Sequence, residues 1–88
     1  MVQSAARMVS YAHDTFTEPE ARAKLGKTVR LLAARHSIPK GSIGSVVDFH
    51  MTSNGTFDVI IKWDVTKESE PFHDLVGKHT YHLLVTEQ

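Results

Sequence analysis

The sequence predicts a mainly β domain of the α+β class, in which a helical N-terminal part precedes about five short antiparallel strands. The first observation is a change of period: apolar residues recur at three-and-four spacing before residue 27 and at alternate positions after it. The second is the repeated occurrence of Gly, Pro and Asn between the alternating runs. Short strands spaced in this way are typical of a small antiparallel barrel or sandwich. We expect one structural domain, with a helical extension over residues 1–26 packed on a barrel over residues 27–88.

The helical extension should contain two helices. Thr17 and Glu20 form a capping box, Pro19 falls in the first turn where its missing N–H costs nothing, and Gly26 suits a left-handed helix end. These features predict a short second helix. The first helix is predicted by an apolar stripe, which consists of Ala5, Met8, Val9, Ala12 and Phe16.

The first strand is predicted in KTVRLLAA, residues 27–34, where Val29 and Leu31 form one apolar face. A loop over residues 35–40 should follow. Its proline cannot donate to a strand ladder, and Gly41 tolerates positive φ.

A β-hairpin is predicted around Asn54 and Gly55, the strongest short turn pattern in the chain. A two-residue turn would mix charged and apolar residues on one face. A three-residue loop over residues 53–55, with Gly55 in a left-handed bulge position, keeps one face apolar, and we expect this register. The inward pairs are then Met51 with Phe57, Phe49 with Val59, and Val47 with Ile61, followed by Trp63. The outward residues are Asp48, His50, Asp58 and Lys62.

Two apolar runs follow the charged stretch WDVTKESEP. They are FHDLVG, residues 72–77, and KHTYHLLV, residues 78–85. Both are short, so two interpretations stay open: two last strands, or one strand and a single tight helical turn.

The order of these runs resembles the SH3-like barrels of the bacterial and organellar accessory type, such as the small photosystem I barrel subunit, the variable chain of ferredoxin-thioredoxin reductase and KOW-type modules. In that family a strand with G-x-x-V-x-L leads to a G-x-x-G-x-V turn, then to a strand ending in a W-D-like pair and a last strand ending in leucine. The resemblance covers roughly the last two-thirds of the chain and implies a five-stranded antiparallel SH3-like barrel. The N-terminal helical extension departs from the family's plan. The matching residues are Gly26, Val29, Leu31, Gly41, Gly44, Val46, Trp63, Asp64, Leu83 and Leu84.

The charge balance and composition exclude several classes of protein. Ten basic and ten acidic side chains cancel, so no strong positive field draws the chain to nucleic acid or anionic lipid. The absence of cysteine excludes disulfides and zinc sites built on sulfur. No apolar run has the pattern of a signal peptide or the length of a membrane span, so we expect a cytoplasmic protein without membrane contact.

No nucleophile and base, paired carboxylates or cofactor loop can be assembled from these residues, so we expect neither an enzyme nor a cofactor. The stretch GSIG, residues 41–44, leads into valines instead of a helix N-terminus, which favours turn geometry over a phosphate loop. Six histidines permit one metal hypothesis, in which His50 and His73 approach each other across neighbouring strands. Asp48 or Asp74 would supply a third ligand. Scattered surface histidines are the alternative.

The surplus of apolar residues on the predicted outer face favours a non-catalytic interaction module, a bacterial accessory or regulatory protein that binds another protein or itself. The alternative, which the KOW resemblance implies, is a nucleic-acid-binding module. Its phosphate contacts would be Lys27, Arg30, Arg35, Lys40 and Lys62. Loops on a rigid barrel carry function more often than strands. The binding candidates, in loops and among aromatic residues, are therefore Arg35, His36, Ile38, Lys40, Phe72 and Tyr81. The interface candidates are Met8, Val9, Leu32 and Ile60.

Overall fold

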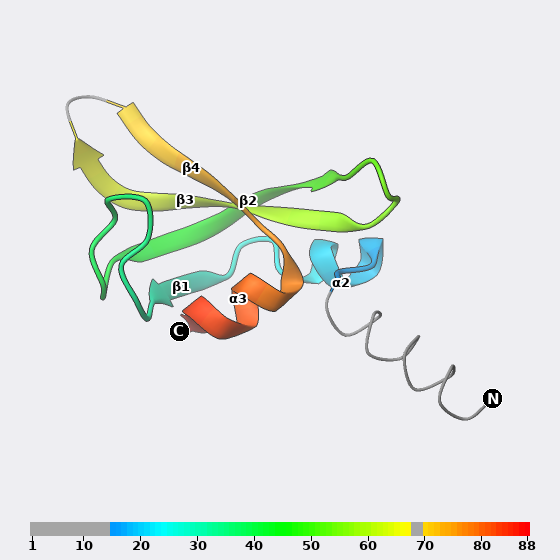
Figure 1. Ribbon diagram of the computed structural model, residues 1–88, viewed down its shortest axis with the longest axis horizontal. Coiled ribbons are helices and arrows are strands. Elements are labelled where there is room, and N and C mark those ends of the chain that lie inside the picture. The colour runs from blue at the N-terminus through cyan, green and yellow to red at the C-terminus, as the bar shows by residue number, and fades with distance from the viewer. Residues whose placement is uncertain (1–14, 68–69) are drawn as a thin grey trace.

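A five-stranded antiparallel sheet organises the computed structural model, which describes residues 15–67 and 70–88 (Figure 1). The strand order is β4-β3-β2-β1-β5, so the mainly β, antiparallel class predicted from the sequence is confirmed. The predicted first helix, with Met8 and Val9, lies outside the described residues. The elements are α2 (Glu18–Ala23), β1 (Thr28–Leu31), β2 (Ile43–Met51), β3 (Phe57–Lys67), β4 (Glu70–Val76), α3 (Lys78–Leu84) and β5 (Val85–Glu87).

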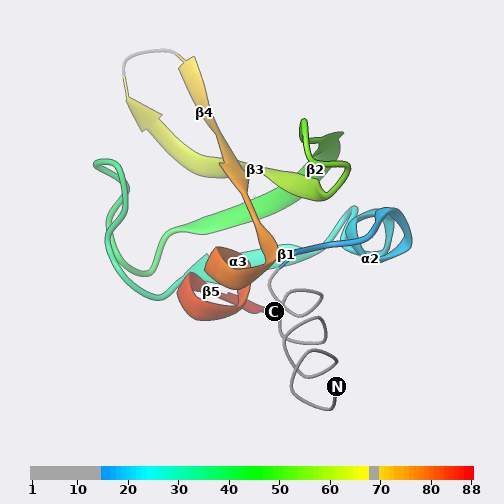
Figure 2. The same cartoon turned by 45° about the vertical axis from the view of Figure 1, so that its right-hand side comes forward.

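The edges of this sheet are β4 and β5. Between these edges no backbone pairing is found in residues 15–67 and 70–88, so the sheet is not closed into the barrel that we expected. The helix α3 carries the chain from the β4 edge to β5, and Figure 2 shows α3 and β5 beside β1.

The predicted second helix is confirmed as α2. Its capping box is complete, because Thr17 N donates to Glu20 Oε1 at 2.9 Å and Glu20 N donates to Thr17 Oγ1 at 3.3 Å. Gly26, after the last turn, has φ +85°. The helix buries Ala21 completely, and this residue anchors α2 on the core.

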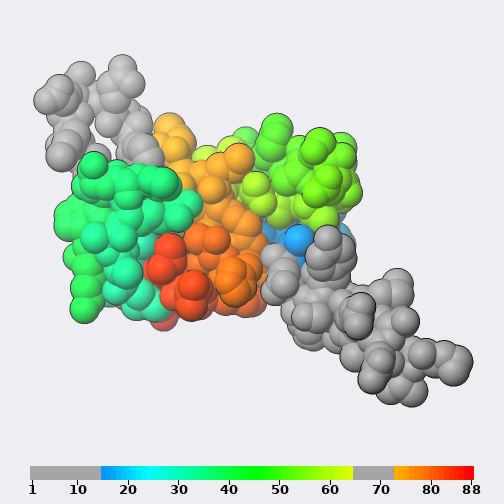
Figure 3. Space-filling model, in the orientation of Figure 1, coloured from blue at the N-terminus to red at the C-terminus, as the bar shows by residue number. Residues whose placement is uncertain are grey.

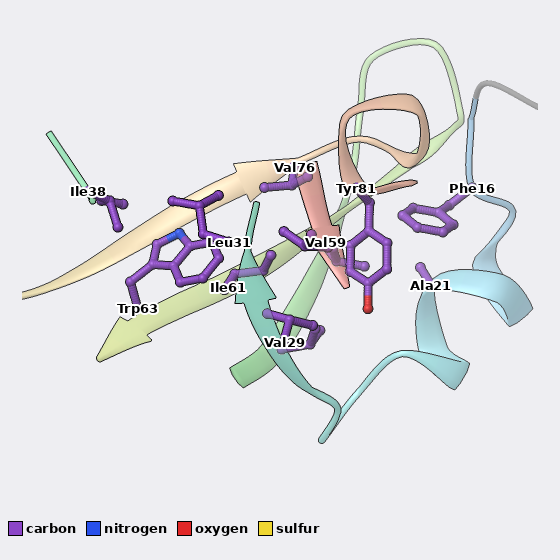
Figure 4. Packing of buried hydrophobic residues seen from close by; sticks show 12 residues of the cluster. Phe16, Ala21, Val29, Leu31, Ile38, Val59, Ile61, Trp63, Val76 and Tyr81 are labelled. Atoms are coloured by element: carbon purple, nitrogen blue, oxygen red, sulfur yellow. The ribbon is translucent and has the colours of Figure 1, made fainter. Parts of the chain in front are cut away.

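The core lies on the face of the sheet that α2 and α3 cover (Figure 4). Val29 and Leu31 on β1 point into it, as their alternation predicts. The strand ends earlier than predicted, at Leu31, and just after it Leu32 N donates to the carbonyl of Leu84 at 2.7 Å. The buried residues of the core are Phe16, Ala21, Val29, Leu31, Ile38, Val46, Val59, Ile61, Trp63, Val76, Tyr81 and Val85.

The hairpin has the predicted three-residue loop. Met51 pairs with Phe57, Phe49 pairs with Val59, and Gly55 has φ +83°. The predicted pair of Val47 with Ile61 is wrong, because a β-bulge inserts one extra residue between Val46 and Asp48.

The bulge exchanges the places of two neighbouring valines. Val46 pairs with Ile61 and is 2% exposed, whereas Val47 is 46% exposed, the reverse of our expectation. A bulge leaves one residue unpaired and bends its strand, so every side chain beyond it changes face relative to a regular register.

The last segment combines helix and strand. Of the two interpretations, the strand followed by a helical turn is confirmed, and the helix is followed by the short strand β5. The helix α3 brings Tyr81 into the core, where its ring meets that of Phe16 edge to face at a centroid distance of 5.7 Å. Val85 on β5 is also buried.

Candidate functional site

The loop predicted to bind a partner contains a tight turn. Arg35 N donates to the Ile38 carbonyl at 3.0 Å, and Ile38 N donates to the Arg35 carbonyl at 2.7 Å. The two central residues, His36 and Ser37, have φ values of 48° and 71°. Positive φ at both central positions is the pattern of a type I′ turn, which glycine and asparagine adopt at lower cost than histidine and serine.

A buried carboxylate holds this loop against the far edge of the sheet. Asp74 on β4 is 5% exposed, and its Oδ2 accepts a hydrogen bond from Arg35 Nε at 2.8 Å. The same oxygen accepts from Trp63 Nε1 at 3.2 Å. Figure 3 shows the segment between β1 and β2 lying beside α3 and the visible part of β4. The ion pair therefore bridges two segments that share no backbone pairing.

Two of the loop candidates, Ile38 and Arg35, are engaged in contacts within the protein. Ile38 is 3% exposed and belongs to the core, so the expectation of an exposed loop fails at this residue. Arg35 is committed to Asp74. His36 and Lys40 are exposed and stay available to a partner.

The aromatic candidates lie in different parts of the chain. Tyr81 is 2% exposed, which leaves no ring surface for a ligand. The side chain of Phe72 lies outside the described residues, although the backbone of Phe72 pairs with Trp63.

Tyr81 forms a second polar cluster with two charged residues. Its hydroxyl donates to Glu87 Oε2 at 2.8 Å, and Lys24 Nζ lies 2.5 Å from the same oxygen. The hydrogen bonds from Lys24 and Tyr81 lower the pKa of Glu87, while burial and the neighbouring Glu87 raise the pKa of Tyr81. This cluster joins α2, α3 and β5, so it closes one end of the core.

A depression of about 310 Å³ lies between α2 and α3. Its wall includes Phe16, Ala23 and His82, and its cations are compensated, since Lys78 Nζ lies 3.0 Å from Glu20 Oε2. The backbone N–H of Thr17 and the Lys78 ammonium lower the pKa of Glu20. The charged side chains on the wall, Glu20, Lys24 and Lys78, are thus all engaged in ion pairs.

The histidines of the metal hypothesis are not brought together. His50 pairs with Asp58 and His73 pairs with Lys62, so their partners on β3 are four residues apart. At about 3.3 Å per residue, the histidines are offset by roughly 13 Å along the strands alone, far beyond a shared coordination sphere. In residues 15–67 and 70–88, no group of three His, Cys, Asp or Glu side chains is placed to hold a metal ion.

The face of the sheet opposite to the core carries an apolar group in its middle. Ile60 on β3 pairs with Leu75 on β4 and with Asp48 on β2, and the bulged residue Val47 stands next to Asp48. Leu75 is 49% exposed and Val47 is 46% exposed, whereas Ile60 is half-buried between its neighbours. We call Val47, Ile60 and Leu75 the outer patch. Of these three, the sequence identified only Ile60.

Charged residues surround the outer patch along β3. Asp58 and Lys62 stand two residues before and two residues after Ile60, so all three share the outer face. Asp48 stands opposite Ile60 on β2, and its Oδ1 accepts from the backbone N–H of Phe49 at 2.8 Å. An apolar centre with a charged rim is the composition of a protein interface.

Leu32, the remaining interface candidate, lies apart from the outer patch. It is 43% exposed and stands just after β1, where its backbone bonds to the end of α3. The sequence pattern did not identify Leu75, because Leu75 follows the charged Asp74 and alternation does not say which of the two points outward. In the structure Asp74 is buried and Leu75 is exposed.

The chain matches no family model, no curated protein and no solved structure. Among the described residues, no helix is both long and apolar enough to cross a membrane.

Proposed function

We propose that the chain is a non-catalytic interaction module, an accessory or regulatory protein with an SH3-like arrangement of strands, which binds a protein through the outer patch. The SH3-like description is supported by five antiparallel strands, of which the first three each follow a glycine with positive φ, and by Trp63 and Asp64 on β3. The observation that carries the function is the outer patch itself.

The outer patch has no cover from the described chain. Both described helices pack on the opposite face of the sheet, where Ala21 and Tyr81 are buried. Leu75 and Val47 therefore keep nearly half of their surface in contact with solvent. Apolar groups gathered on a sheet face and rimmed by charges are typical of a protein-binding surface.

Nucleic-acid binding has weaker support. Arg35, one of the five cations proposed to contact phosphates, is paired with Asp74. Lys62 shares its sheet face with the carboxylates of Asp58 and Asp64. Binding to a phosphate backbone depends on uncompensated cations, and this face does not provide a continuous set of them.

The proposal is tested by capturing a partner with the intact protein, identifying it, and titrating the purified partner against three variants. Ile60→Asp and Leu75→Asp each introduce a charge into the outer patch, and either should weaken binding about tenfold or more. Leu83→Asp is the matched control, because Leu83 is 63% exposed on α3, away from the patch. Circular dichroism should show that all three variants fold.

Equal binding by the wild type and both patch variants would refute the proposal. Binding to random RNA or DNA that weakens steeply with salt and is unaffected by Ile60→Asp would instead support the nucleic-acid alternative.

A further inference from the structure

We propose that the outer patch binds a second copy of this chain, face to face, around a two-fold axis that passes between Ile60 and its counterpart. The inference rests on the proposed function and names the partner. It is carried by the order of residues on the outer face of β3, where Asp58, Ile60 and Lys62 place a negative, an apolar and a positive side chain at successive outward positions.

This order is self-complementary under one two-fold axis. An axis in the plane of the interface and perpendicular to the strands reverses the direction of β3, so that Ile60 faces Ile60 of the second copy. Asp58 then faces Lys62 of the second copy, and Lys62 faces its Asp58. The same residue pair is thus satisfied twice, as an isologous interface requires.

The alternative axis is disfavoured by the same charges. An axis parallel to the strands would keep the direction of β3 and place Asp58 against Asp58 and Lys62 against Lys62. Like charges placed opposite each other destabilise an interface, so the pattern selects the antiparallel arrangement.

The position of β3 in the sheet suits this arrangement. β3 lies between β4 and β2, so the apolar row formed by Leu75, Ile60 and the bulged Val47 crosses three strands close to the axis. Each of these three residues would contact the same residue of the second copy. The dimer would thereby bury the apolar surface that is exposed in the single chain. Asp48, which pairs with Ile60 on β2, lies in the same row and would also meet its own counterpart. This one like-charge contact is outnumbered by the two Asp58–Lys62 pairs, and Asp48 Oδ1 is held by the backbone N–H of Phe49.

Neither charge has a competing partner in the described chain. Within residues 15–67 and 70–88, no ion pair engages Asp58 or Lys62. The chain has equal numbers of acidic and basic side chains, so two copies approach without net repulsion at neutral pH.

The test is a set of charge exchanges followed by sedimentation equilibrium of the intact protein. The wild type should show a concentration-dependent dimer. Asp58→Lys and Lys62→Asp should each weaken the dimer about tenfold or more, because each places like charges opposite each other twice. The double exchange, D58K with K62D, should restore the dimer.

Mixing the two single variants gives the sharpest result. One variant then offers two lysines at positions 58 and 62 and the other offers two aspartates, so the mixture should form heterodimers more tightly than either variant alone forms homodimers. Asp64→Lys is the matched control: it makes the same charge change at the next outward position of β3, which the two-fold axis places opposite the uncharged Thr56, and its dimer should persist.

A wild type that stays monomeric at all concentrations would overturn the second-copy inference, as would a mixture that fails to recover dimers. The proposed function is judged separately. If the wild type is monomeric and Ile60→Asp still loses binding to a different purified protein, only the self-association is refuted. If Ile60→Asp changes neither dimer formation nor binding to a different protein, both proposals fail.

Discussion

Gly44 lies against the indole of Trp63, since the two residues are paired across β2 and β3 and a Cβ at position 44 would stand 2.7 Å from Cε3 of that ring. The glycine does not have a positive φ; it is required because a large side chain occupies the space above it. Our assignment of Gly44 to a turn is therefore wrong, although the assignment of Gly41, with φ +90°, is confirmed.

Gly44→Ala should destabilise the fold by about 1–3 kcal/mol, the usual cost of overpacking a core. The added methyl would also lie 2.8 Å from Cγ2 of Ile61, so both neighbours would have to move. Urea denaturation measures the change. Gly77→Ala is the control: its Cβ meets only the Asp58 carboxylate at 3.3 Å, and its cost should stay below that of Gly44→Ala. Equal costs would contradict the close-packing explanation.

Asp74→Asn should cost about 2–4 kcal/mol of stability, less than the full loss of a buried ion pair because the Arg35 side chain is partly exposed. The substitution removes the charge that both Arg35 and Trp63 approach. Thermal unfolding followed by tryptophan fluorescence measures the change, and the signal comes from Trp63 alone because it is the single tryptophan. Asp64→Asn, at an exposed position, should change stability by no more than about 0.5 kcal/mol.

Residues that accept positive φ at the two central positions should stabilise the turn at the start of the loop. The double variant His36→Asn with Ser37→Gly should stabilise the protein by about 0.5–1 kcal/mol, because both central residues would then suit a type I′ turn. Urea denaturation would show a higher midpoint with an unchanged slope. A lower midpoint would mean that His36 or Ser37 makes a contribution beyond the turn.

Glu87→Gln should make stability less dependent on pH at the acid end. The pKa of Glu87 in the folded protein lies below its ordinary value of 4.5, so its contribution is present above that value and is lost as pH falls through the lowered pKa. The difference in unfolding free energy between wild type and variant should therefore be largest near neutral pH and vanish in strong acid. Glu18→Gln serves as the control, since Glu18 is exposed at the start of α2. A difference that is constant with pH would contradict the assignment.

Sequence patterns predicted the parts of the fold that depend on local chemistry. The capping box at Thr17 and the loop at Gly55 are each determined by a few adjacent residues, and both are confirmed. The bulge at Val47 was not predictable in this way. Val46 and Val47 are both β-branched, and only the packing of Val46 against the core decides which of them is inserted into the strand.

The candidate site was predicted less well, because exposure depends on contacts that are distant in sequence. The charge and loop position of Arg35 are typical of a binding residue, but its guanidinium is bound by the carboxylate of Asp74, which lies on β4. Tyr81 was assigned to a partner, yet α3 turns it into the core. Ile60 was correctly placed on the outer face, because the hairpin register alone determined its direction.

The cluster at Tyr81 also bears on how the chain folds. Lys24 and Glu87 are 63 residues apart in sequence. β1 pairs with β2, which follows it closely in the chain, and with β5, which lies far from it in the chain. Contacts that close so long a loop form late, because the entropy of closure is lost before the contact is gained. We therefore expect the hairpin of β2 and β3 to form early. The docking of β5, which pairs with β1 and whose Glu87 accepts a hydrogen bond from Tyr81, should be a late step of folding and should open early in hydrogen exchange.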